Sequence, residues 1–501
     1  MKEIEFEDIQ GFVLSGYDDL MQSACYLLLQ IKDAGNAKSW MDSMASKIDN
    51  EGKGLSSSQS HEPNNRVNLA FTPSGLKALG INEEVLKGFS SEFLDGLGKR
   101  SGQVGLTGDN APVHWRWGDH QANGQQLHMV LLLFAADDQK LADLVTHYEA
   151  GLQKAGLHLI KKLDTLCGSK RPEDKEHFGF RDGIAQPAIE GTDGAKLTTP
   201  GNWIKPGEII LGYENENTPD LGPTITPGPA IPIDKDPSDI LPRHLINNET
   251  KDFGRNGTYI VFKQFVQHVK PFWEFMTNAA EKEAGEESVE AGIKLASKMV
   301  GRWPSGVPLE LSPDGDNVDL QEEDFDKFLY DTEDDQGSRC PFESHIRRTN
   351  PRNMLLKDKG LVHDVETSVE TMKRHRIIRR GRVYGEPLAD SFSPHDYLRK
   401  EDDGVDRGLM FLCVNAHLDR QYEYMQKKWI TPVDKSPLFS GADPICGNQD
   451  VDVSGQQGDF TYHEQSDDCC VKGMSNFTTV VGGAYLFMPG IRAIKYIANL
   501  P

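Results

Sequence analysis

The chain has 501 residues, of which 37% are hydrophobic and 26% are charged, and its formal net charge is −23. This length and composition are typical of a soluble protein with a large buried core and two or more domains. The strong negative charge argues against nucleic acid or an anionic membrane surface as a partner, because both are themselves negatively charged.

The first residues, MKEIEFEDIQGFVL, carry acids where a secretory signal would carry a basic segment and then an apolar run. No later apolar stretch is long enough to cross a bilayer. The 7 cysteines are scattered and form no CxxC pair, so we expect reduced thiols rather than disulfides or a zinc site. Together these features predict a cytoplasmic protein without a membrane span.

The first third of the chain shows a strand, helix, strand pattern twice. Apolar runs predict the strands, and apolar positions at helical spacing predict the helices. In chain order we expect a strand at 23–31, a helix at 37–48, strands at 66–72 and 127–135, a helix at 139–156 and a strand at 157–163. Two such units in one antiparallel sheet predict a ferredoxin-like α+β domain.

The second half repeats these elements. We expect strands at 257–265, 408–416 and 483–489, and helices at 269–282, around 284–299 and at 418–429. The segment 217–242 is too rich in proline and glycine for regular structure and is predicted to be a surface excursion. The predicted fold class is therefore α+β, with two ferredoxin-like domains at 1–190 and 191–501, each built on a four-stranded antiparallel sheet with helices.

The stretch HFGFRDGIAQP, residues 177–187, holds a charged pair between two glycines and ends in a proline. Glycine and proline at these positions are typical of a tight loop, and Asp182 could simply hydrogen-bond its own turn. A catalytic role for Asp182 is the alternative interpretation, and the rest of the chain decides between them.

Several segments resemble the dye-decolorizing peroxidases, a family of haem peroxidases. CPFESHIRRTNPR (340–352) resembles the segment that carries the family's axial haem histidine, and GFRDG (179–183) matches its GxxDG motif. Further similar segments lie at 8–17, 69–81, 207–216, 301–309, 376–385, 442–447 and 482–489, so the resemblance covers nearly the whole chain. The long insertions between motifs are most similar to the larger subgroup of the family.

The resemblance implies a haem peroxidase with haem b, held mainly by the C-terminal domain. It implies that His345 is the iron ligand and that Asp443 hydrogen-bonds the far nitrogen of His345, although a turn aspartate before a proline would look the same. On the other face of the haem it implies Asp182 as the proton shuttle and Arg379 as the positive charge that stabilises developing anionic oxygen. Arg379 lies in a basic run, which more often forms a solvated face.

Three further residues complete the expected haem site. Arg347, two residues after His345, is a candidate partner for a haem propionate, since an arginine fork matches a carboxylate. Leu409 and Phe411 alternate on one strand and so share a face. The resemblance implies that they cover the distal haem pocket, and ordinary core packing explains them equally well.

These interpretations predict an enzyme that reduces hydrogen peroxide and oxidises bulky dye-like or phenolic substrates. One alternative is a haem carrier or iron-release protein without efficient peroxide turnover, and another is a structural α+β protein that has lost haem. Asp182 and Arg379 together favour the peroxidase, because a carrier has no use for a matched acid and cation.

Overall fold

The computed structural model describes residues 3–17, 20–50, 64–118, 125–192, 202–216, 230–233, 236, 239–284, 288–330, 334, 336–354, 365–433, 441–450, 458–464 and 467–501. No helix among them is long and apolar enough to cross a membrane.

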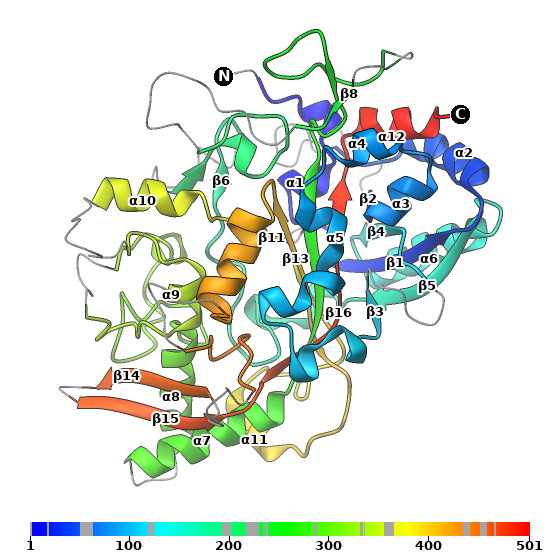
Figure 1. Ribbon diagram of the computed structural model, residues 1–501. Helices are drawn as coiled ribbons and strands as arrows, with labels where there is room; N and C mark the ends of the chain where they lie inside the picture. Colours follow the sequence, from blue (N-terminus) through cyan, green and yellow to red (C-terminus); the bar gives the residue numbers. More distant parts are fainter. Residues whose placement is uncertain are drawn as a thin grey trace.

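The N-terminal half forms four antiparallel strands in the order β5–β1–β4–β2 (Figure 1). The strands are β1 (Ser23–Ile31), β2 (Asn65–Phe71), β4 (Met129–Ala135) and β5 (Leu157–Asp164). Helix α2 (Ala34–Ala45) follows β1, and helix α6 (Asp138–Leu152) joins β4 to β5. This connectivity is that of a ferredoxin-like domain, so the predicted arrangement is confirmed.

The C-terminal half repeats the arrangement in the order β11–β13–β10–β16, with β12 also paired to β13. The strands are β10 (Thr258–Gln267), β11 (Ile378–Arg379), β12 (Arg382–Tyr384), β13 (Gly408–Asn415) and β16 (Thr478–Met488). Helices α7 (Val269–Ala284) and α8 (Val289–Val300) follow β10. The predicted helix at 418–429 is helical, but most of it has π-type hydrogen bonding, in η11 (Asp419–Glu423) and η12 (Gln426–Ile430).

The two four-stranded sheets join edge to edge, because β16 pairs with β2 at Phe487 and Phe71. A short strand, β3 (Trp117–Gly118), adds to β16 in parallel, so the whole forms one ten-stranded sheet. All nine residues of β1 are buried. Both faces of the sheet are therefore covered, which explains why its strands read as continuous apolar runs rather than as alternating ones.

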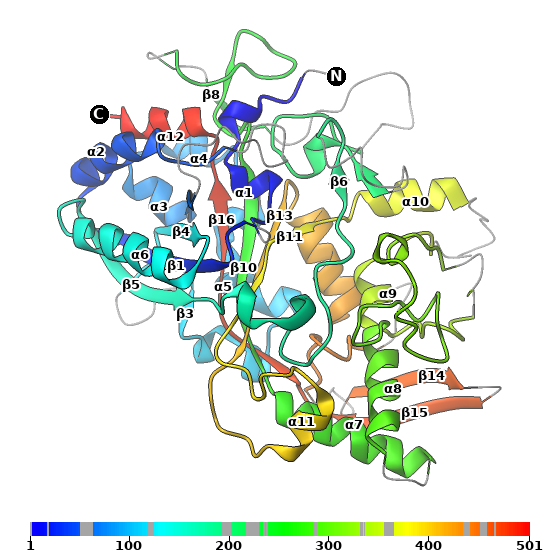
Figure 2. The ribbon, with the colours of Figure 1, turned by 180° about the vertical axis from the view of Figure 1, so that it is seen from behind.

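Smaller elements surround this sheet. They are α1 (Gly11–Leu14), α3 (Pro73–Ala78), α4 (Glu83–Leu86), α5 (Ser91–Arg100), β6 (Ala188–Ile189), β7 (Trp203–Ile204), β8 (Pro232–Ile233), β9 (Lys251–Asp252), α9 (His345–Thr349), α10 (Val365–Lys373), α11 (Pro394–Arg399), β14 (Gly458–Glu464), β15 (Asp467–Met474) and α12 (Ile491–Ala498). Figures 1 and 2 show both chain ends at one end of the molecule and α7, α8 and the β14–β15 hairpin at the other.

The expected surface excursion at 217–242 is only partly described, since 217–229 lie outside the described residues. In the described part, β8 pairs with β9, so the prediction that this segment lacks regular structure is wrong at 232–233. The pairing is two residues long, which is consistent with the high proline content of the segment.

Candidate active site

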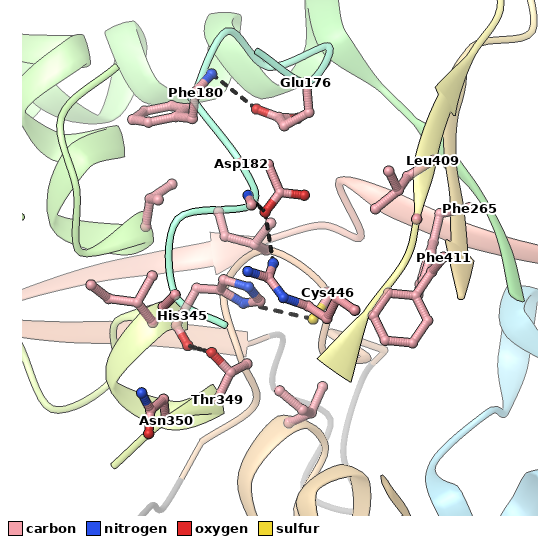
Figure 3. Close-up of a pocket in the computed structure, with 18 of the residues that line it drawn as sticks. Glu176, Phe180, Asp182, Phe265, His345, Thr349, Asn350, Leu409, Phe411 and Cys446 are labelled. Atoms are coloured by element: carbon pink, nitrogen blue, oxygen red, sulfur yellow. Dashed lines mark hydrogen bonds and ion pairs between the residues drawn. The ribbon is translucent and has the colours of Figure 1, made fainter. Parts of the chain in front are cut away.

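A large cavity lies between the loop at 176–185, strands β10 and β13, and helix α9 (Figure 3). It contains about 1700 Å³ of empty space, including its open mouth. Five of the seven residues expected at the site line it, namely Asp182, His345, Arg379, Leu409 and Phe411.

His345, the first residue of α9, forms a buried pair with Asp443. Its Nδ1 lies 2.9 Å from Oδ2 of Asp443, whose side chain is completely buried. The other oxygen of Asp443 accepts the backbone N–H groups of Ile445 and Cys446, each at 2.9 Å. Burial opposes both charges, but their mutual attraction outweighs it, so the pKa of Asp443 is lowered and the pKa of His345 is raised. With Nδ1 engaged, Nε2 is the nitrogen of His345 that can bind a ligand.

A second ion pair in the cavity joins the two expected distal residues. Nη1 of Arg379 lies 2.6 Å from Oδ1 of Asp182, and the N–H of Gly183 donates to the same oxygen at 2.6 Å. Oδ2 of Asp182 has no hydrogen-bond partner among the described residues. Burial raises the pKa of Asp182, but the Arg379 charge and the Gly183 hydrogen bond outweigh it, and the net pKa falls to about 2. Asp182 is therefore a carboxylate with one free oxygen.

Arg379 is held in place through its backbone. It lies on β11, and Gln186 both accepts a hydrogen bond from its N–H and donates one to its carbonyl oxygen, each at 3.1 Å. Arg181, the residue before Asp182, forms an ion pair with Glu322 at 2.7 Å. Arg379 is thus the arginine of this region that meets Asp182.

The loop that carries Asp182 is shaped by two glycines and one acid. Gly179 and Gly183 adopt φ values of 91° and 86°, which favour glycine. The carboxylate of Glu176 accepts the N–H groups of Phe178 and Phe180 at 2.9 and 3.0 Å, and it also accepts a hydrogen bond from Gln267. Burial raises the pKa of Glu176 to about 7. Glu176 therefore fastens the start of the loop from inside the cavity, as Figure 3 shows.

Leu409 and Phe411 lie on β13 and form an apolar wall of the cavity, next to Phe265 of β10 (Figure 3). Both are half-buried and also pack against the hydrophobic core. The structure thus places both side chains in the cavity wall. An apolar wall next to the Asp182–Arg379 pair limits the water that reaches it.

Arg347 does not line the cavity, and the prediction that it binds a haem propionate is wrong. Its guanidinium is completely buried, forms an ion pair with Asp334 at 2.7 Å and donates to the carbonyl of Cys340 at 2.6 Å. The rings of Tyr330 and Phe342 lie on it, each with its centroid 4.4 Å away. The reason is helical geometry, because residues two apart on a helix point in different directions and His345 already faces the cavity.

Other cationic and polar side chains line the cavity, and of these Arg302, Asn350 and Arg352 were not predicted as site residues. Nη2 of Arg302 and both amide atoms of Asn350 are buried without a hydrogen-bond partner in the described part of the chain. Arg352 pairs with Asp326, and Arg376 donates to Asn202 at 2.9 Å. Arg352 lies in the same 340–352 segment as His345, so a search for an arginine beyond the first turn of the helix could have found it.

These arginines form a positively charged region of the cavity. Burial and neighbouring guanidinium groups lower the pKa values of Arg302 and Arg376 to about 10. Unpaired buried cations are costly, so a ligand that brings carboxylates would complement this region.

Several dye-decolorizing peroxidases are similar to this chain over most of its length. The DyP dimeric alpha+beta barrel domain matches residues 8–172. The chain is 26% identical to dye-decolorizing peroxidase msp1 of Mycetinis scorodonius, over 99% of this chain and 88% of that protein. It is also 26% identical to the multifunctional dye peroxidase DyP2 of an Amycolatopsis species, over 94% of this chain and 91% of that protein. A solved dye-decolorizing peroxidase complex with 2,6-dimethoxyphenol superimposes with a TM-score of 0.71 at 25% identity, covering 99% of this chain and 100% of that chain.

The matched residues 8–172 span the N-terminal ferredoxin-like domain, and the residues of both ion pairs lie after them in the chain. Over nearly its whole length the chain is similar to dye-decolorizing peroxidases.

Proposed function

We propose that this protein is a haem-dependent peroxidase that reduces hydrogen peroxide and oxidises bulky dye-like or phenolic substrates. The observation that carries the proposal is the presence, in one cavity, of the His345–Asp443 pair and the Asp182–Arg379 pair. The first pair suits an axial iron ligand, and the second supplies a proton acceptor beside a fixed positive charge.

The residues of the cavity fit a haem. Nε2 of His345 would bind the iron, and Asp443 would hold the imidazole in the matching tautomer. The buried polar atoms of Arg302 and Asn350, with Arg352 and Arg376 nearby, suit the haem propionates. The cofactor is proposed to be haem b, because the sequence has no CxxCH motif for covalent attachment.

Bound haem iron would supply the redox chemistry that splits the oxygen–oxygen bond of peroxide. The free Oδ2 of Asp182 accepts the proton from the incoming peroxide and returns it to the departing oxygen, which leaves as water. The guanidinium of Arg379 stabilises the negative charge that develops on that oxygen. Leu409 and Phe411 keep bulk water from this proton transfer.

The carrier alternative is disfavoured by the same geometry. A protein that only stores or releases haem needs the axial histidine, but it gains nothing from a carboxylate held at 2.6 Å from an arginine on a glycine-shaped loop. The two glycines at positive φ give this loop a shape that other residues rarely adopt, which suits a carboxylate that must stand at a defined point.

We further propose that the chain divides at about residue 190 into an N-terminal ferredoxin-like domain and a larger haem-holding C-terminal domain. The order of the strands supports this division. A cytoplasmic location is also proposed, supported by seven free cysteines, of which Cys470 is exposed. Exposed thiols are more common in proteins of a reducing compartment.

The test is a haem titration of the apo protein followed by one addition of hydrogen peroxide. Wild type should bind one haem with a sharp Soret band, change its spectrum on addition of peroxide, and then turn over an anthraquinone dye and 2,6-dimethoxyphenol. His345→Ala should lose most of its haem affinity. Haem binding without a peroxide reaction would favour the carrier, and unchanged haem affinity in His345→Ala would remove His345 as the ligand.

A further inference from the structure

A buried lysine lines the cavity and has no part in the chemistry described so far. Lys263 lies on β10, between β13 and β16, where it pairs in register with Phe411 and Gly483. It is 4% exposed, and its side chain contributes to the cavity wall.

The surroundings of this ammonium are mostly aromatic. Nζ lies 4.5 Å from the ring centroid of Phe265, 5.3 Å from that of Phe411 and 5.2 Å from that of Tyr422. Its polar contact is the side-chain oxygen of Gln426 at 3.5 Å, which is a weak hydrogen bond. Within the described residues, no carboxylate lies within ion-pair distance of Nζ.

Such a group is costly to bury. A desolvated ammonium without a counter-charge opposes folding, and three aromatic rings recover only part of that cost. Burial accordingly lowers the pKa of Lys263 to about 8, so the side chain stays charged in neutral and acidic solution. A methionine would fill this space without the cost of a buried charge. The presence of a charge here therefore indicates that the charge has a role in the cavity.

Lys263 shares its cavity with the proposed iron ligand. Lys263, His345 and Cys446 all line this cavity, and the sulfur of Cys446 lies 3.8 Å from Nδ1 of His345. Lys263 and His345 therefore belong to the same low-dielectric region, in which charges act on one another more strongly than in water.

We propose that Lys263 is a buried positive charge that raises the reduction potential of the iron bound at His345. The inference rests on the proposed haem function. Reduction of ferric iron adds one negative charge to the site, and a nearby ammonium stabilises the reduced form. The Asp443 carboxylate acts in the opposite direction through His345, because it increases the basicity of the imidazole and favours ferric iron. Lys263 thus limits how far the proximal pair lowers the potential.

The experiment is a spectroelectrochemical titration of the ferric–ferrous couple in the holoprotein at pH 6. Lys263→Met and Lys263→Gln should both shift the midpoint to a more negative potential, whereas Lys263→Arg should stay close to wild type because it keeps the charge. Lys298→Met is the matched control. Lys298 is 7% exposed and its Nζ lies 5.0 Å from the ring centroid of Tyr462, but it does not line the cavity.

The outcomes separate this inference from the function on which it rests. If wild type takes up no haem, the proposed function fails. If wild type binds haem and reacts with peroxide, but both neutral variants keep the wild-type midpoint, only the role of Lys263 is overturned. An equal shift in Lys298→Met would also overturn it, because the cause would then be general loss of buried charge.

Discussion

At the scale of single residues, Asp182 in the cavity wall and Asp443 buried behind His345 have different roles because their surroundings differ. Asp443 is completely buried and its oxygens are occupied by His345 and two backbone N–H groups, so it can orient the imidazole but has no room for a substrate. The side chain of Asp182 is 36% exposed, and Oδ2 is free of partners in the described part of the structure. Asp182 is therefore the acid that can meet peroxide.

The role of Arg379 is tested by comparison with its neighbour. Arg379→Leu should leave haem bound but slow the peroxide step by roughly 10²–10³-fold, the usual effect of removing one charge-stabilising donor. Arg380→Leu is the matched control, because Arg380 donates to the carbonyls of Phe12 and Val13 and does not line the cavity. Stopped-flow absorbance measures both rates. If Arg380→Leu is the slow variant, the assignment of the charge to Arg379 is wrong.

At the scale of elements, the loop that carries Asp182 depends on one glycine more than on the other. A Cβ on Gly179 would lie 2.6 Å from the carbonyl oxygen of Phe392, whereas a Cβ on Gly183 would meet no atom within 4 Å. Both positions have positive φ, so both substitutions strain the backbone. Of these two glycines, only Gly179 also lets the loop lie directly against another segment, at Phe392.

This difference predicts that alanine substitution lowers the free energy of unfolding by different amounts at the two positions. Gly183→Ala should lower the free energy of unfolding by about 1–2 kcal/mol through backbone strain alone. Gly179→Ala should lower it further, because the Phe392 carbonyl must also move. Denaturant titration of the two apo variants gives the comparison. Equal losses would show that the contact with Phe392 does not hold the loop.

Elements with regular patterns could be predicted from the sequence, and features set by tertiary contacts could not. The apolar runs placed β1 and β10 within a few residues, because both faces of those strands are buried. Asp182 and His345 could be predicted because each lies in a short motif of consecutive residues, GFRDG and CPFESHIRR. Arg347 was misplaced because the prediction did not treat residues 345–349 as a helix, on which Arg347 points away from the cavity that His345 faces. Lys263 carries no local signal, since its cavity is assembled from distant segments.

At the scale of the whole molecule, the two halves share one sheet and one core. The β2–β16 pairing crosses between them, and the largest buried cluster contains residues of both, including Leu27 and Val261. Neither half can lose its structure without exposing the apolar surface of the other. The two ferredoxin-like domains should therefore unfold together.

Calorimetry of the apo protein tests this coupling. We expect a single heat-absorption peak with agreement between the calorimetric and van't Hoff enthalpies. Two resolved transitions would contradict the coupling and would mean that the β2–β16 contact is too weak to unite the halves.

The central claim is that the fold holds the carboxylate of Asp182 at a cofactor site. Its most direct test is to measure the rate of the peroxide step as a function of pH in wild type and in Asp182→Asn. Since the pKa of Asp182 is lowered to about 2, its proton-accepting form persists well below pH 6.5, where a histidine would become protonated. Stopped-flow measurements from pH 4 to 7 should show that wild type keeps its rate into acid, while Asp182→Asn is roughly 10²–10⁴-fold slower at every pH. A wild type that reacts only near neutrality, or an Asp182→Asn variant with the full rate, would contradict the claim.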